Sequence, residues 1–382
     1  MEFKSYEKSR VLLLAQYGSV GGTRTYTMKL INFYVINGFD LTVVGYGSRN
    51  DPDMAHYCKQ RNIPLFHYDD VLNFSGKFKR QPFRVFQERK MLKQFVCSLQ
   101  PKIIVASVGD PGLFLGHMNL IDNSIYILHT SPEYGSGYSV WRRCITRKLI
   151  RLILVPRKCC FVTVSQYASR KMLDNWGLSG SRQARVIYNC SEEIVALSST
   201  LNKSVKVLTV GHVVDYKNPL FWIEIARHVL TQIPDIKFTW IGPGSLLDAC
   251  REHVKDLRLE KNIEFIGALK DLNSFYAESD IYLQPSKIES LGISVLDAMR
   301  HGIPSVVSNR GGLPEVVQDS ISGFVLDLDE GAEKFAQRIV NLAKDQESRM
   351  RMGLAAQNTY SEKFSPTRWE IEMLTMHAEI LR

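Results

Sequence analysis

The sequence predicts an α/β protein with two domains, each built on a parallel sheet that helices cover on both faces. Three observations lead to this prediction. The chain has 382 residues, which is too long for one ordinary hydrophobic core. Short, almost continuously apolar runs rich in β-branched residues alternate with helical patterns, as strands buried on both faces do. These runs form two sets, and a polar segment at 191–204 separates them.

The expected strands follow in order along the chain. In the first set they are 11–15, 41–47, 103–108, 124–130 and 161–165, and in the second set they are 205–211, 236–242, 263–269, 281–286 and 304–309. Two such sets predict two Rossmann-like domains, an N-terminal one at 1–190 and a C-terminal one at 205–365. Residues 191–204 are the expected linker, and 366–382 an expected helix that returns to the N-terminal domain.

The composition excludes several classes of protein. No apolar run approaches the roughly 20 residues that span a bilayer. The opening "MEFKSYEKSR" is followed by a short apolar run, "VLLLA", which is unlike a signal peptide. The seven cysteines are odd in number and include no CxxC pair, as is typical of buried small hydrophobic residues in a reducing compartment. We therefore expect a cytoplasmic protein.

The loops after the expected strands indicate where a ligand binds. In open parallel sheets, ligands bind outside the carboxyl ends of the strands. The loops expected there, such as "QYGSVGGTRTY", "LHTSPEYGSGY" and "SKIESLG", are rich in Gly, Ser and charged residues. Two facing sets of such loops predict a site in an interdomain cleft. A helix that begins at Gly292 would direct free backbone N–H groups and the positive end of its dipole there, which is typical of phosphate binding.

A series of motifs fills the second half of the chain. Gly211, His212 and Lys217 stand in "VGHVVDYKN", and "FIGAL", "SDIYLQPS" and "GGLPEVV" accompany the acid pair Glu289 and Asp297. Over 205–330 this series resembles the nucleotide-binding half of glycosyltransferase family four. The resemblance implies the GT-B fold, with two Rossmann-like domains whose parallel sheets face each other across an interdomain cleft. It also implies sugar transfer from a nucleotide diphosphate sugar with retention of anomeric configuration.

Over residues 1–190 the resemblance is carried by fewer residues. Gly21 and Gly22 follow the first strand, His129 follows "YIL", and "VSQYASRKML" and "VIYN" complete the domain. The resemblance implies that His129 touches the donor sugar near the reacting carbon. Gly21 and Gly22 permit close backbone approach to the diphosphate, although a simple strand-to-helix turn would use them as well.

In the second half the resemblance assigns each acid a different part of the donor. Glu289 is assigned to the donor sugar and Asp297 to the ribose hydroxyls. Between them, the backbone amides of Leu291, Gly292 and Ile293 would hold the diphosphate.

Lys217 would place a positive charge on the leaving diphosphate, where negative charge develops in the transition state. The predicted catalytic residues are therefore His129, Lys217 and Glu289. The predicted donor-binding residues are Gly21, Gly22, Gly211, His212, Leu291, Gly292, Ile293 and Asp297.

Two residues depart from the family pattern. Asp297 stands where Glu is more common, so the ribose contact is lost, mediated by water or restored by a local shift. His212 stands where Arg is usual, and a neutral imidazole brings no fixed charge. Either His212 works protonated, or Arg24 or Arg310 takes the place of the arginine, or activity is low.

Signals for a metal or a cofactor are weaker. Asp327-x-Asp329 resembles the metal-binding DxD of the other glycosyltransferase architecture, but short strings of this kind arise by chance, as "DPD" at 51–53 illustrates. No loop combines GxGxxG with an acid at the spacing that dinucleotide binding needs. We predict neither a catalytic metal nor a cofactor.

The sequence therefore predicts a retaining hexosyltransferase that uses an acceptor hydroxyl, in the assembly of bacterial cell-surface polysaccharide or glycolipid such as lipopolysaccharide. UDP is favoured as the donor nucleotide only because it is frequent in the family. Side chains identify neither the sugar nor the acceptor. A nucleotide-sugar epimerase on the same fold and a non-catalytic scaffold remain the alternatives.

Two segments hold the excess positive charge of this +9 chain. Residues 75–102 contain eight Lys or Arg against one acid, and 140–158 contain seven with no acid. Apolar side chains such as Leu92 and Phe95 are interleaved with these cations, which suits a helix on an anionic bilayer. We predict peripheral binding to the inner face of the cytoplasmic membrane, a lipid-linked saccharide acceptor and no nucleic acid partner. Packing of the apolar side on the N-terminal sheet is the structural alternative.

Overall fold

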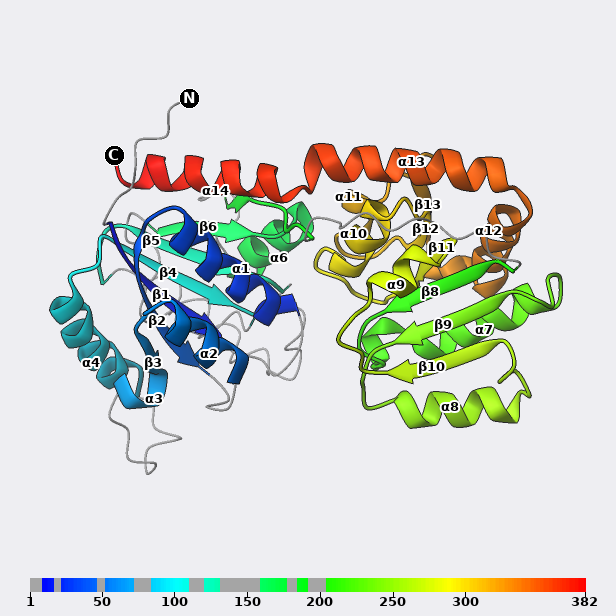
Figure 1. Ribbon diagram of the computed structural model, residues 1–382, viewed down its shortest axis with the longest axis horizontal. Coiled ribbons are helices and arrows are strands. Elements are labelled where there is room, and N and C mark those ends of the chain that lie inside the picture. Colours follow the sequence, from blue (N-terminus) through cyan, green and yellow to red (C-terminus); the bar gives the residue numbers. More distant parts are fainter. Residues whose placement is uncertain are drawn as a thin grey trace. The chain divides into compact units, whose positions relative to one another are not determined.

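The computed structural model describes residues 9–16, 22–46, 52–71, 84–109, 120–130, 159–176, 184–191 and 204–382 (Figure 1). The chain divides into two compact units. We call Met1–Ile187 with Glu370–Arg382 the first unit, and Tyr188–Trp369 the second unit. Each contains one parallel sheet, so the prediction of two Rossmann-like α/β domains is confirmed.

The first unit is built on a seven-stranded sheet in the order β3-β2-β1-β4-β5-β6-β7. Its strands are β1 (Arg10–Gln16), β2 (Asp40–Tyr46), β3 (Leu65–His67), β4 (Ile103–Val108), β5 (Ser124–Leu128), β6 (Cys159–Thr163) and β7 (Arg185–Val186). The described helices are α1 (Gly22–Ile36), α2 (Pro52–Gln60), α3 (Tyr68–Val71), α4 (Arg84–Leu99), α6 (Gln166–Trp176) and α14 (Pro366–Ile380). Every residue of β4 and β5 is buried, as expected of central parallel strands that helices cover on both faces.

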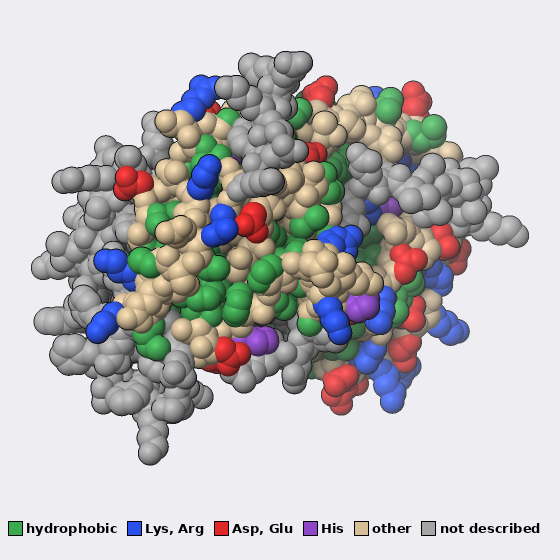
Figure 2. Space-filling view, turned by 60° about the vertical axis from the view of Figure 1, so that its left-hand side comes forward, with side chains coloured by type: hydrophobic (Ala, Val, Ile, Leu, Met, Phe, Trp, Pro, Cys, Tyr) green, Lys and Arg blue, Asp and Glu red, His purple; other side chains and the backbone are tan. Residues whose placement is uncertain are grey.

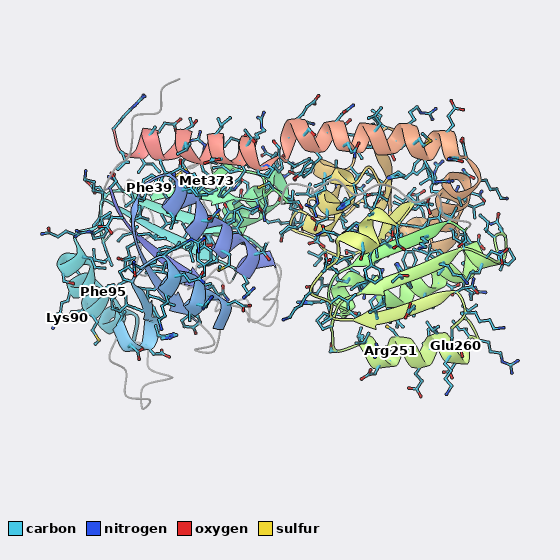
Figure 3. The ribbon with its side chains drawn as sticks, in the orientation of Figure 1. Phe39, Lys90, Phe95, Arg251, Glu260 and Met373 are labelled. Atoms are coloured by element: carbon cyan, nitrogen blue, oxygen red, sulfur yellow. The ribbon has the colours of Figure 1, made fainter. Side chains whose placement is uncertain are left out.

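Helix α14 brings residues from late in the sequence into the core of the first unit. His377 is fully buried on it, and its Nδ1–H donates to the carbonyl oxygen of Met373 at 2.7 Å. Its Nε2 accepts from the Tyr34 hydroxyl at 3.0 Å, and the Phe39 ring lies 5.8 Å from the imidazole. Figure 3 labels Phe39 and Met373 in this part of the first unit. Burial lowers the pKa of His377 to about 4, so this histidine is neutral near pH 7.

The second unit is built on a six-stranded sheet in the order β10-β9-β8-β11-β12-β13. Its strands are β8 (Lys206–Val210), β9 (Lys237–Ile241), β10 (Ile263–Gly267), β11 (Ile281–Gln284), β12 (Ser305–Ser308) and β13 (Gly323–Leu326). Its helices are η2 (Asp215–Lys217), α7 (Pro219–Leu230), α8 (Leu247–Asp256), α9 (Asn273–Ala277), α10 (Ile293–Arg300), α11 (Leu313–Val316), η3 (Leu328–Glu330), α12 (Ala332–Lys344) and α13 (Gln346–Lys363).

An aromatic cluster lies in the core of the second unit. The Trp222 ring lies 5.3 Å from that of Trp240 and 5.4 Å from that of Phe265. The indole N–H of Trp222 donates to the hydroxyl of Thr209 at 2.7 Å, so the buried polar atom of this large side chain is satisfied. This cluster fixes α7 against β8, β9 and β10, and thereby positions the loop that leaves β8.

Both sheets have a topological switch point. The strand order reverses between β1 and β4 in the first unit and between β8 and β11 in the second. The loops that follow adjacent strands on the two sides of a switch point diverge and leave a crevice at the carboxyl edge. Ligand sites are expected at these two edges.

The sequence did not predict two edge strands of the first unit. β3 and β7 contain three and two residues, and their side chains are half-buried or exposed. Strands this short show neither a continuous apolar run nor an alternating pattern, so nothing in the sequence distinguishes them from loop.

Candidate active site

The predicted donor residues of the second unit lie at its switch point. Gly211 and His212 directly follow β8, and Lys217 ends the short helix η2 after them. β11 pairs with β8 in parallel, so the loop that carries Glu289 leaves the sheet at the same edge. Residues that are about 70 positions apart in the sequence therefore meet in one place.

Lys217 and Glu289 form an ion pair through Nζ and Oε2. Each side chain is only 14% exposed. A carboxylate this deeply buried needs a cation or strong donors, because desolvation penalises the charged form. The same Oε2 also accepts from Gln284 Nε2 at 2.7 Å. The structure thus brings together two of the three predicted catalytic side chains and adds a residue that the sequence had not assigned.

The backbone of the Glu289 loop is held by the "GG" of "GGLPEVV". The amide of Gly312 donates to the carbonyl oxygen of Glu289 at 2.9 Å. Gly311 has a φ of +65°, and a Cβ there would overlap that same carbonyl oxygen. Only glycine lets the backbone at 311 lie this close to the Glu289 carbonyl group. The "GGLPEVV" motif therefore contributes to the site, although it follows Glu289 in the sequence.

Helix α10 begins immediately after Gly292, as predicted. Gly292 has a φ of +100° and serves as the N-cap residue, and no side chain caps the helix. The first turn contains no acidic side chain that would oppose an anion. The backbone N–H groups of this first turn and the helix dipole therefore favour negative charge beside Lys217.

Asp297 lies on α10, and its carboxylate faces neighbouring protein groups. Its Oδ1 accepts from the hydroxyl of Ser191 and lies 3.4 Å from Arg300 Nε. The Asp297 side chain is 22% exposed, and that of Arg300 only 9%. Arg300 is also fixed through Nη2, which donates to Asn273 Oδ1 at 3.1 Å. The residue that the resemblance assigns to the ribose is thus an ion-pair partner within the second unit.

The two arginines considered as replacements for a family arginine both contact acids. Arg310 Nη2 lies 3.6 Å from Asp329 Oδ2 in the second unit. Arg24 Nη2 lies 2.9 Å from Asp53 Oδ2 in the first unit. His212 is half-buried in the turn after β8. That one of these three supplies positive charge to a diphosphate, or that activity is low without it, stays a prediction.

The DxD-like string has structural roles. The Asp327 side chain caps the short helix η3, and the Asp327 backbone N–H donates to Glu330 Oε1 at 2.9 Å, which completes a capping box. Asp329 is the partner of Arg310. Within the described ranges, no three side chains of His, Cys, Asp or Glu converge as metal ligands do. That the reaction uses no metal and no cofactor stays a prediction.

In the first unit, His129 lies at the carboxyl end of β5, near the switch point between β1 and β4. Its Nε2 is 2.9 Å from the Ser107 hydroxyl, and its ring centroid is 4.3 Å from that of Tyr26. The side chain retains some solvent exposure, yet surrounding protein desolvates it and lowers its pKa to about 3. His129 is therefore a neutral imidazole near pH 7, suited to hydrogen bonding rather than to carrying charge.

The glycine pair of the first unit is described only in part. Gly22 is the first residue of α1 and is exposed. Gly21 lies outside the described residues. At this edge Gln16 Oε1 accepts from the amide of Gly109 at 2.8 Å, which joins the carboxyl ends of β1 and β4.

Sequence reasoning missed several residues of the site. Gln284 had a usable signal, because it is a polar residue in the otherwise apolar strand "IYLQ". Ser191 and Ser107 had none, since each contacts a residue that lies far away in the sequence.

Comparison with known proteins shows which family and proteins the chain is similar to. Residues 192–359 match the family described as glycosyl transferases group 1. An uncharacterised glycosyltransferase of Haemophilus influenzae is 23% identical over 319 residues, which cover 81% of this chain and 83% of that protein. UDP-Gal:alpha-D-GlcNAc-diphosphoundecaprenol alpha-1,3-galactosyltransferase of Escherichia coli is 29% identical over 139 residues, which are 36% of each chain.

A solved structure extends the likeness to the fold of the whole chain. Anabaena HepE in complex with UDP and glucose aligns with a TM-score of 0.73 at 18% identity, covering 97% of this chain and 100% of that one. The chain therefore has the GT-B fold, and the match of its residues 192–359 to the group 1 glycosyl transferases indicates a glycosyltransferase.

Proposed function

We propose that this glycosyltransferase moves a hexose-type sugar from a UDP-sugar to a hydroxyl of a lipid-linked saccharide, with retention of anomeric configuration. The observation that carries the proposal is the Lys217–Glu289 pair beside the uncapped first turn of α10. It places a cation and helix N–H groups, which suit a diphosphate, next to a carboxylate that suits sugar hydroxyls.

Two similar proteins support the choice of donor and acceptor. The E. coli relative is named for UDP-Gal and for an acceptor on diphosphoundecaprenol, and HepE was solved with UDP and glucose. We therefore include in the proposal a UDP-sugar donor, a lipid-linked acceptor and a role in the assembly of surface polysaccharide or glycolipid.

In the proposed reaction the acceptor oxygen attacks the anomeric carbon while the bond from that carbon to the diphosphate oxygen breaks. The leaving diphosphate oxygen takes the acceptor proton, so no protein carboxylate acts as a nucleophile. Lys217 neutralises the charge that develops on the diphosphate. Glu289 accepts hydrogen bonds from the sugar, and neutral His129 donates or accepts one near the reacting carbon.

The direct test is incubation of the purified chain with UDP-glucose, UDP-galactose, UDP-N-acetylglucosamine, GDP-mannose and ADP-glucose, with and without a synthetic polyprenyl-diphosphate-linked sugar. We expect UDP release that the acceptor stimulates, and a product that keeps the anomeric configuration of the donor. Formation of an epimeric nucleotide sugar, or an inverted product, would contradict the proposal. Thermal shifts with UDP, GDP and ADP then identify the base, since selective binding raises apparent stability.

We also propose that the protein binds an anionic membrane surface to reach its acceptor. None of the described helices is both long and apolar enough to span a bilayer. Leu92 packs in the core of the first unit and Phe95 against it, so this apolar side of α4 is occupied by the protein itself. Lys90 and Lys93 on the same helix are exposed. The membrane proposal therefore rests on charge.

Of the two predicted basic segments, 75–83 and the whole of 140–158 lie outside the described residues. On the face drawn in Figure 2, the described Lys and Arg side chains are interspersed with apolar and uncharged ones. We expect salt-sensitive sedimentation with vesicles that contain phosphatidylglycerol, lost when Arg84, Arg89, Lys90 and Lys93 are changed together to Gln. Equal sedimentation with neutral vesicles would contradict the membrane proposal and leave the transferase proposal intact.

A further inference from the structure

Gln284, the last residue of β11, contacts Glu289 but has none of the roles in donor binding or catalysis described above. Its side chain is only 2% exposed, at the end of a strand that is otherwise apolar. A buried amide is costly unless its donors and acceptor are hydrogen-bonded. Its partners therefore indicate what the residue does.

The hydrogen bonds of Gln284 fix the orientation of its amide. Nε2 donates to Glu289 Oε2 at 2.7 Å, and Oε1 accepts from the hydroxyls of Ser294 at 3.0 Å and Tyr282 at 3.2 Å. An ionised carboxylate can only accept, so the NH₂ group must face Glu289. The carbonyl oxygen then faces two hydroxyls, each of which is able to donate. The reverse orientation would set two acceptors against each other.

The two hydroxyls belong to rigid parts of the second unit. The Tyr282 hydroxyl also accepts from the amide of Val210 at 3.1 Å, directly before Gly211 at the end of β8. Its oxygen lies 3.2 Å from the carbonyl oxygen of Val210 as well, so its one proton is shared between that oxygen and Gln284 Oε1. Burial raises the pKa of Tyr282 above its usual range, so the hydroxyl keeps its proton. Ser294 lies in the first turn of α10, and its carbonyl oxygen accepts from Tyr276 at 3.2 Å. Gln284 is thus tied to β8, β11 and α10 at once.

We propose that Gln284 is a positioning residue that holds the Glu289 carboxylate in place for the donor sugar. This inference rests on the proposed function of Glu289. Oε2 accepts from both Lys217 and Gln284, and no described side chain donates to Oε1, which leaves Oε1 to accept a sugar hydroxyl. When Lys217 turns to the leaving diphosphate, Glu289 loses its cation, and the Gln284 amide remains as the donor that prevents rotation of the carboxylate.

A neutral donor suits this task better than a second cation. An arginine or lysine at 284 would attract the diphosphate as well as Glu289, and it would carry an uncompensated charge in a buried position. The glutamine amide orients the carboxylate without competing with Lys217. It is itself oriented by groups that do not titrate near pH 7.

The first test is Gln284→Leu, which has a similar volume and no amide. We expect turnover at saturating donor to fall about 10-fold, as for the loss of one hydrogen bond to a charged group. Binding of UDP alone should change less than twofold, because the sugar is absent from UDP. The control is Thr359→Val, which removes a buried hydrogen-bonding side chain elsewhere in the second unit, on α13, and should alter neither quantity.

The second test is Gln284→Glu. A positioning role predicts that acid restores the activity of this variant, whereas a merely structural role does not. The introduced carboxyl group would face Glu289 at hydrogen-bonding distance, so the pair shares a proton with a raised pKa. When protonated, the new group donates to Glu289 as the amide does, and when ionised it repels Glu289. Activity relative to the unaltered chain should therefore increase as pH falls from 8 to 6.

The outcomes separate the two proposals. If the unaltered chain releases UDP and both Gln284 variants match it with parallel pH profiles, the positioning role is wrong and the proposed function stands. If Gln284→Leu weakens UDP binding as much as turnover, the residue shapes the nucleotide site instead. If the unaltered chain turns over none of the nucleotide sugars, the proposed function fails and the positioning role fails with it. Thermal unfolding of each variant shows whether a loss merely reflects instability.

Discussion

The two switch points of this protein carry their candidate residues in different ways. At the β8/β11 edge, Lys217, Glu289 and Gln284 are joined by direct hydrogen bonds, and glycine–backbone contacts fix the loop around them. At the β1/β4 edge, His129 has one side-chain hydrogen bond among the described residues, to Ser107. The candidate residues of the second unit thus form a connected network, whereas His129 of the first unit has a single described side-chain hydrogen-bond partner.

Glu289→Gln is the strongest test of this difference between the two switch points. If the network serves the sugar, turnover at saturating donor should fall on the order of 100-fold, the loss that follows misplacement of reacting groups. Binding of UDP should change little, since UDP lacks the sugar that Glu289 contacts. Steady-state kinetics and calorimetry with UDP provide the two measurements. Unchanged turnover would remove Glu289 from the site and leave the network without a catalytic purpose.

Lys217→Ala tests the phosphate side of the same network. We expect UDP binding to weaken by about 1.5–3 kcal/mol, the range for hydrogen bonds to charged groups. The change also leaves Glu289 buried without its cation, so the stability of the second unit should fall. Calorimetry measures the affinity and denaturant unfolding the stability. The control is Lys287→Ala, whose exposed ion pair with Asp215 should contribute little. Equal affinities of both variants for UDP would contradict the assignment.

His377 tests the first unit instead. Its pKa is about 4 in the fold, against roughly 6.5 in the unfolded chain, so the unfolded state binds more protons between these values. The contribution of neutral His377 to the free energy of unfolding is complete above pH 6.5 and is lost as pH falls toward 4. The loss is about 2 kcal/mol at pH 5. Urea unfolding at pH 7.5 and pH 5 measures it. His377→Gln should flatten the dependence, and an equally steep dependence in that variant would assign the acid sensitivity to other groups.

His212→Arg is expected to have the smallest effect. A guanidinium after β8 restores a fixed charge where the family usually has one, so UDP affinity should stay equal or rise by about 1 kcal/mol or less. The affinity of the variant for UDP, measured at low and at moderate salt, tests this. Loss of turnover with intact folding would mean that the imidazole has a role of its own, and that the network of the second unit includes it.

The sequence predicted the parts of this protein whose signals are local. Continuous apolar runs located ten of the strands, and Gly292 located the start of α10, because both are governed by neighbouring residues. The resemblance assigned Glu289 and Lys217 to one donor site, but their direct ion pair was not predicted. The contact of Asp297 with Ser191 was not, since only the fold brings these distant residues together. Gln284 was visible as a polar residue in an apolar strand, but its meaning depends on two hydroxyls and a carboxylate from other segments.

Helix α14 has a consequence for how the chain acquires its structure during synthesis. The residues around Tyr34 and Phe39 are made early, yet the helix that covers them with Met373 and His377 is made only after the whole second unit. A ribosome-bound chain therefore exposes that aromatic surface while the second unit is already able to fold. The first unit completes its core last, although most of it is synthesised first. Chaperone dependence and early proteolysis of the nascent protein should accordingly concentrate on the first unit.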